Sequence, residues 1–102
     1  MFEMKFARYV GTLPSNVRLL AVRRLWKRRL TLSSARTPHW ACAAVCAPRP
    51  RCSVYVADLD RDVCRFYELV DAPDASAPDE DCDVKSCFAK ACAMGMMNSP
   101  PN

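Results

Sequence analysis

The chain has 102 residues and a formal net charge of +4, so it holds at most one small domain. Although 51% of the residues are hydrophobic, Leu, Ile, Val and Phe together supply only 21 of them. That share is close to the roughly 20% below which chains tend to be disordered. No apolar run approaches the ~18 residues of a membrane-spanning helix, so we expect none.

The charge is divided unevenly along the chain. Residues 1–51 carry 11 Lys/Arg and one acid, whereas residues 52–102 carry 4 Lys/Arg and 10 acids. A basic half of this kind favours a polyanionic partner, and the acidic half offers a competitor for the same surface.

The first expected element is a short N-terminal strand, where Phe2, Met4 and Phe6 alternate with charged residues. Ser15 then suits the N-cap of a helix near 16–30. The apolar stripe of this helix is formed, at three- and four-residue spacing, by Leu19, Val22, Trp26 and Leu30. Basic residues occupy most of the remaining circumference, so the sequence predicts a basic amphipathic helix.

The predicted helix is the main candidate for a binding surface. Guanidinium groups pair with phosphates in a bidentate manner, and an indole ring can stack on an exposed base. The residues expected to bind nucleic acid are Arg23, Arg24, Trp26, Lys27, Arg28 and Arg29. Two other interpretations stay open: a helix whose charges only face water, or one that docks on a partner groove, a membrane surface or a calmodulin-like protein.

The middle of the chain is less regular. Residues 33–52 contain prolines and scattered cysteines and are expected to form loops or short turns. A short strand is predicted near 53–57 from its β-branched and aromatic residues. Residues 63–70 fit either a helix capped by Asp58 or Asp60, or the second arm of a hairpin.

The C-terminal part divides into an acidic segment and a final helix. Residues 71–83 combine acids with proline and alanine, a composition typical of a disordered linker. A helix near 82–94 follows and ends at Gly95. The predicted fold class is therefore a small, helix-rich α+β protein that is partly disordered, with one domain over 1–70 and a C-terminal helix and frayed tail over 84–102.

The seven cysteines suggest a second kind of site. Four soft ligands, as a tetrahedral zinc site requires, lie within 14 residues at His39, Cys42, Cys46 and Cys52. The spacing contains no C-x-x-C pair, and the alternative is that free thiols fill a thin core. No other cofactor is indicated.

The N-terminal ten residues carry charges and lack the apolar core of a secretory signal peptide. We therefore expect an intracellular protein with reduced thiols, not a secreted one. The run RRLWKRR also fits a nuclear-import signal.

No catalytic motif is present in the sequence, since it has neither a glycine-rich phosphate loop nor an oriented nucleophile. The sequence predicts a non-enzymatic accessory or regulatory protein that binds the phosphate backbone of RNA or DNA without sequence specificity. The alternatives are a protein-interaction module and a poorly folded chain with little evolved function.

Overall fold

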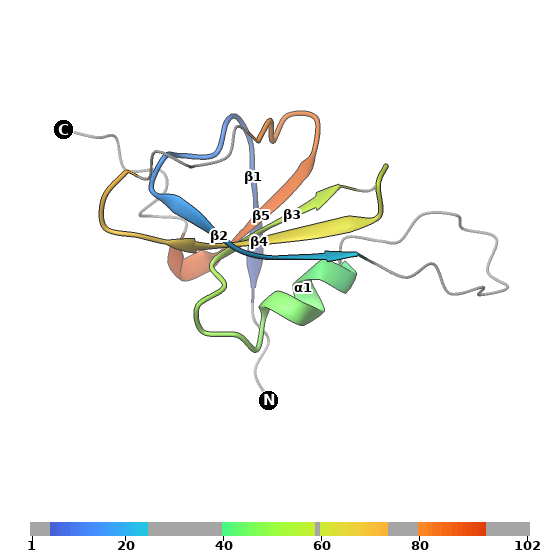
Figure 1. Cartoon of the computed structure of the whole chain (residues 1–102), viewed down its shortest axis with the longest axis horizontal. Coiled ribbons are helices and arrows are strands. Elements are labelled where there is room, and N and C mark those ends of the chain that lie inside the picture. The colour runs from blue at the N-terminus through green and yellow to red at the C-terminus, as the bar shows by residue number, and fades with distance from the viewer. Residues whose placement is uncertain (1–4, 25–39, 59, 74–79, 94–102) are drawn as a thin grey trace, which may run out of the picture.

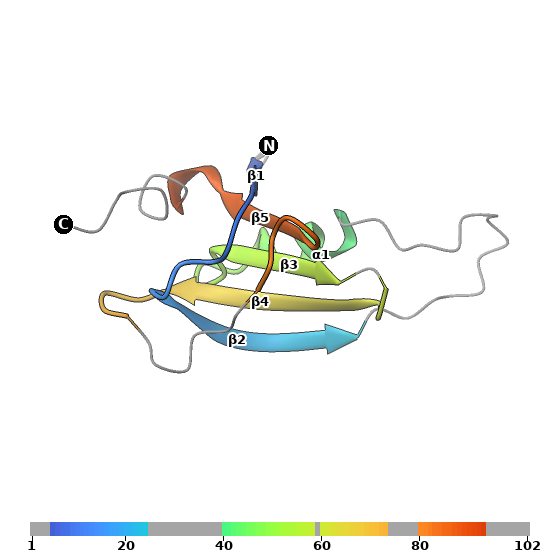
Figure 2. The same ribbon diagram turned by 90° about the horizontal axis from the view of Figure 1, so that it is seen from above.

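The computed structural model describes residues 5–24, 40–58, 60–73 and 80–93. They form a seven-residue helix, α1 (Trp40–Cys46), and a five-stranded antiparallel sheet. The strands are β1 (Phe6–Tyr9), β2 (Val17–Arg24), β3 (Val54–Asp58), β4 (Val63–Leu69) and β5 (Ser86–Lys90). Their order across the sheet is β1-β5-β3-β4-β2 (Figure 2). β3 is therefore central, and β1 and β2 are the two edges.

The centre of the sheet is the hairpin of β3 and β4, which pair from Val54–Tyr67 to Asp58–Val63. Every residue of β3 is buried, because it has strands on both sides and cover on both faces. The chain reverses near Asp62, whose φ of 55° lies in the left-handed region that Asp tolerates better than most residues. The hairpin fixes the register on which the other strands assemble.

One face of the sheet is covered by α1, which lies below the strands in Figure 1. Successive side chains of a strand alternate between the two faces. Tyr55, Ala57 and Phe66 point to the α1 face and pack with the helix. Tyr55 also contacts the ring of Phe88, whose centroid is 5.3 Å away.

The other face is covered by two chain segments instead of a helix. Residues 10–13 and 80–82 lie across it and are linked where Cys82 N–H donates to the carbonyl of Gly11 at 2.8 Å. Gly11 has a φ of 93°, a conformation that glycine adopts without steric cost. The apolar cluster beneath these segments includes Leu13, Val17, Val54, Val56, Tyr67 and Ala89.

Three disulfides tie the covering segments to the sheet. Cys42–Cys64 joins α1 to β4, Cys46–Cys52 closes the loop after α1, and Cys82–Cys87 joins the 80–82 segment to β5. Cys92 is free and exposed. The protein is thus cysteine-rich in a structural sense, and the crosslinks add stabilisation that its few aliphatic residues cannot supply.

The prediction of a basic amphipathic helix over 16–30 is wrong for residues 16–24, the part of this range that the structure describes. Residues 17–24 form β2, paired along its length with β4. A β-bulge between Leu19 and Ala21 inserts one residue, so Leu19 and Val22 face the same side of the strand. Their three-residue spacing, which resembles a helical stripe, is therefore produced by a bulged strand. Residues 25–30 lie outside the described residues.

The C-terminal helix predicted near 82–94 is also wrong, because residues 86–90 form β5 between β1 and β3. The protein is mainly antiparallel sheet and not helix-rich. The strand predicted near 53–57 corresponds to β3, and of the two options for residues 63–70 the hairpin arm is the one formed. Within the predicted linker, residues 74–79 lie outside the described residues, whereas Glu80 and Cys82 are buried against the sheet.

Candidate binding groove beside strand β2

β2 is the longer and more open of the two edge strands. It has eight residues, of which only Val17 is buried. It pairs with β4 on one side, and no other described strand pairs with its second side. An edge of this kind leaves backbone N–H and C=O groups available for pairing with another chain.

A groove of about 560 Å³ runs beside β2 on the α1 face. Its floor is mainly apolar and comes from β2, α1, the loop after α1 and β4, through Leu20, Ala21, Val45, Pro50, Cys52 and Phe66. Val22 and three arginines, Arg23, Arg49 and Arg51, complete the lining. The groove thus combines an apolar floor with a cationic rim.

The loop of residues 47–52 forms one wall of the groove and is held at several points. The Cys46–Cys52 disulfide closes it, and Cys52 N–H donates to the Arg49 carbonyl at 3.1 Å. Lys90 reaches from β5, and its Nζ donates to the same carbonyl at 2.9 Å. Burial lowers the pKa of Lys90. These contacts fix the backbone of the loop and therefore the positions from which the side chains of Arg49 and Arg51 extend.

Glu68 of β4 binds Arg51, one of the arginines that line the groove, and also Arg18 of β2. Arg18 donates through Nε at 2.8 Å, and Arg51 donates through Nη2 at 3.0 Å. The hydrogen bonds from Arg51 and Arg18 lower the pKa of the Glu68 carboxyl group. Two guanidinium groups therefore share one carboxylate, and this cluster keeps a positive charge of one.

Arg23, Arg24 and Arg49 add charge that no described side chain neutralises. All three are exposed, and none of them forms a side-chain hydrogen bond or an ion pair within the described residues. Arg18, Arg23, Arg49 and Arg51 together with Glu68 give the α1 side of the molecule a local charge of +3, and Arg24 adds a charge on the other face. The surface is suited to a negatively charged ligand that also carries an apolar group.

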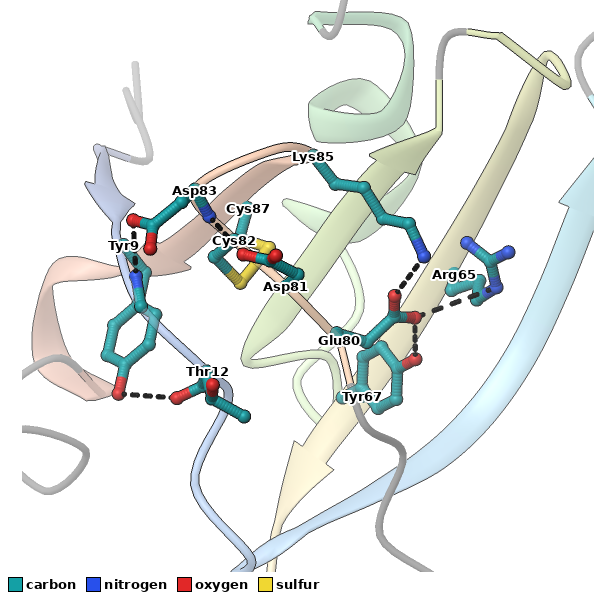
Figure 3. The surroundings of a disulfide bond; sticks show 11 residues. Tyr9, Thr12, Arg65, Tyr67, Glu80, Asp81, Cys82, Asp83, Lys85 and Cys87 are labelled. Atoms are coloured by element: carbon teal, nitrogen blue, oxygen red, sulfur yellow. Dashed lines mark hydrogen bonds and ion pairs between the residues drawn. A yellow bond between two sulfur atoms is a disulfide. The ribbon is translucent and has the colours of Figure 1, made fainter.

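A second charged cluster, on the opposite face, has the chemistry of a structural contact. Glu80 accepts hydrogen bonds from Tyr67 Oη at 2.5 Å and Lys85 Nζ at 2.9 Å, and it lies 3.6 Å from Arg65 Nε (Figure 3). Burial disfavours the carboxylate, but the hydrogen bonds from Lys85 and Tyr67 and the charge of Arg65 outweigh it, so the pKa of Glu80 is lowered. Burial and the neighbouring carboxylate raise the pKa of Tyr67. The cluster anchors the 80–85 segment, and its acidic and basic groups are paired with one another instead of facing a ligand.

The structure places only part of the predicted nucleic-acid site. Arg23 and Arg24 lie at the end of β2, not on a helix, and their side chains start from opposite faces of the sheet according to their partners Cys64 and Val63. Trp26, Lys27, Arg28 and Arg29 lie outside the described residues, as does Leu30 of the predicted docking stripe.

Of the predicted zinc ligands, His39 lies outside the described residues, and the three cysteines are in disulfides. A disulfide sulfur is not a thiolate, the form in which cysteine binds zinc. Among the described residues there is no group of three or more potential metal ligands. Cys42, Cys46 and Cys52 thus belong to one buried cluster, but they form disulfides: Cys42 with Cys64, and Cys46 with Cys52.

Sequence reasoning missed Arg49, Arg51 and Phe66, which line the groove, and the ion pair of Arg18 with Glu68, a carboxylate that also binds Arg51. They are spread over about half of the chain, and only the pairing of β2 with β4 brings them together. One local signal was present, because two arginines flank Pro50 immediately before Cys52. Once Cys46 and Cys52 are known to be bonded, that short loop must present both side chains near α1.

No protein-family model, curated protein or solved structure has significant similarity to this chain. None of the described helices is long and apolar enough to cross a membrane.

Proposed function

We propose that the protein is a non-enzymatic binding module that holds an acidic segment of a partner protein in the groove beside β2. The observation that carries the proposal is the position of Arg23 and Arg49, two exposed arginines without described acidic partners, on the rim of an apolar groove. Opposite charge at such a rim steers association and fixes orientation, while apolar contact supplies affinity.

The mixed lining favours a protein partner over a nucleic acid. A phosphate backbone would engage the arginines but would leave Leu20, Val45 and Phe66 without an apolar ligand group. A peptide offers carboxylates and an apolar side chain on one short segment. The three disulfides also favour a location of the protein in an oxidising compartment, whereas the sequence led us to expect a reducing one.

Nucleic-acid binding is the hypothesis to be tested against this one. Of its six residues the described part of the chain holds only Arg23 and Arg24, which are exposed at the end of β2. Phosphate binding would depend steeply on salt and would not depend on the apolar floor of the groove.

The test uses the full chain in its disulfide-bonded form and a fluorescent peptide, acetyl-TETVTET-amide. Its controls are TQTVTQT, which lacks the charges, and TETTTET, which lacks the apolar residue. Arg23→Glu and Arg49→Glu should each weaken binding of TETVTET about tenfold, because an attraction becomes a repulsion. Arg8→Glu, on the opposite edge strand β1, is the matched control and should leave the affinity unchanged.

The same titrations are repeated with a generic DNA duplex and a generic single-stranded RNA. Binding of TETVTET that needs both Glu and Val supports the proposed function. Failure of the peptide to bind, together with salt-dependent binding of DNA or RNA, would replace the proposal by the nucleic-acid hypothesis. No binding of any of these probes would remove both.

A further inference from the structure

The open side of β2 has backbone groups that point away from the sheet. Val70 N–H donates to the Asn16 carbonyl at 2.9 Å, which makes residues 16 and 70 a hydrogen-bonded pair. In an antiparallel ladder such pairs alternate with pairs whose backbone groups point outward. The backbone groups of Val17 and Leu19 therefore point outward. Val17 is buried, whereas Leu19 is 47% exposed, so Leu19 presents its N–H and C=O groups at the open edge.

The charges on β2 disfavour pairing of this edge with a second copy of the chain. In the symmetric antiparallel register that overlaps all eight residues of β2, Arg18 of one copy would lie opposite Arg23 of the other. Like charges placed directly opposite each other destabilise a strand pair. The same arginines attract a strand that carries carboxylates, so the edge selects an acidic partner.

The spacing of these arginines defines the pattern of that partner. Arg18 and Arg23 are five residues apart, but because of the bulge they pair with Glu68 and Cys64, which are four apart on β4. Both arginines therefore lie on the α1 face, and Arg23 lines the groove. A strand laid along β2 would present residues two apart to this face. The matching pattern is acid-x-apolar-x-acid.

From these observations we infer that β2 binds its partner by strand addition: an extended acidic segment becomes a sixth strand, with its two carboxylates at Arg18 and Arg23 and its central apolar side chain over Phe66. The inference rests on the proposed function, since it specifies how the same groove is filled. It adds that the backbone of β2, and not only its side chains, forms the binding site.

The test separates backbone pairing from charge attraction with two N-methylated forms of TETVTET. One is methylated at the Glu and Val amides and the other at the Thr amides, so that charge and side chains are unchanged. In a strand only one of these two sets of N–H groups faces β2. One form should bind about tenfold more weakly, the loss expected for removing two or three backbone hydrogen bonds, and the other should bind like the parent peptide.

Hydrogen exchange of the protein gives a second readout. The parent peptide should slow exchange of the Leu19 amide and leave the Ala7 amide of β1 unchanged. Equal binding of both methylated forms, equal weakening of both, or unchanged exchange at Leu19 would overturn strand addition while the acidic-segment proposal stands. Failure of the parent peptide to bind would overturn the proposed function itself.

Discussion

Glu68 and Glu80 each gather basic groups, on opposite faces of β4, but the two clusters present different surfaces to the solvent. Both carboxylates are largely covered, with side-chain exposures of 11% and 5%. The arginines that bind Glu68 are 54% and 70% exposed, whereas Arg65 and Lys85 around Glu80 are 19% and 32% exposed. Ion pairs of the same kind therefore leave the basic groups around Glu80 mostly covered, whereas those around Glu68 form an accessible cationic surface.

The largest effect on stability should come from the disulfides that hold the covering segments on the two faces of the sheet. Converting both Cys42 and Cys64 to alanine should lower the free energy of unfolding by about 3 kcal/mol, because that crosslink spans 22 residues. The matched change at Cys82 and Cys87, which spans 5 residues, should cost about 2 kcal/mol. Denaturant titration of both variants measures the difference, and a larger loss for the shorter crosslink would contradict the ranking.

Substituting Glu80→Gln should destabilise the protein by about 2 kcal/mol. The change keeps the size of the side chain but removes the charge that accepts from Tyr67 and Lys85. Thermal unfolding at neutral pH provides the measurement. A variant as stable as the parent would mean that the charge of Glu80 does not contribute to holding the 80–85 segment.

Acidification should reproduce this loss in the unaltered protein. The pKa of Glu80 is lower in the folded state than its ordinary value of 4.5, so its stabilisation is complete above that value. It is lost as the pH falls through the folded pKa. The difference in unfolding free energy between the parent and Glu80→Gln should therefore shrink as the pH is lowered below about 4.5, and a constant difference would argue against the ionised contact.

A smaller effect is expected from Tyr67→Phe, which removes one hydrogen bond to Glu80 and leaves the ring in the core. The cost should be about 1.5 kcal/mol, the lower end for a bond to a charged group. A double-mutant cycle with Glu80→Gln should give non-additive losses, because both changes remove the same contact. Additive losses would show that the two side chains act independently.

The smallest effect on stability should come from Glu68→Gln, because the arginines that it binds are exposed. Its consequence should instead appear in binding. Loss of the carboxylate releases Arg18 and Arg51, and the affinity for TETVTET should rise about two- to fivefold. Glu80→Gln is the comparison, and it should leave peptide affinity unchanged at a temperature where it is folded.

The sequence contained enough local information to predict β3 and to keep a hairpin open for residues 63–70. Those strands are adjacent in the chain and rich in β-branched and aromatic residues. β2 could not be predicted in the same way, because its bulge gives Leu19 and Val22 a helical spacing. β5 was hidden by small residues, since its alternating Cys87 and Ala89 give little hydrophobic contrast.

The site was predictable only where its residues are close in sequence. Arg23 and Arg24 could be predicted as site residues because they belong to a basic run. Arg51 and Glu68 come from distant segments, and their contact depends on the Cys46–Cys52 crosslink and on the register of β2 with β4. Seven cysteines allow many pairings, and spacing alone does not choose among them.

The strand order has a consequence for how the protein reaches its native state. Among the described strands, only β3 and β4 are neighbours both in the chain and in the sheet. β1 pairs with β5 across 84 positions at Phe6–Lys90, and β2 pairs with β4 across 52 at Val17–Leu69. Contacts of such long range slow folding, because the entropy of closing the intervening loops is lost before they form. We therefore expect both edges of the sheet to be completed after its centre. The arginine-lined groove therefore exists only in the finished fold, and a chain that is still folding cannot capture a partner there.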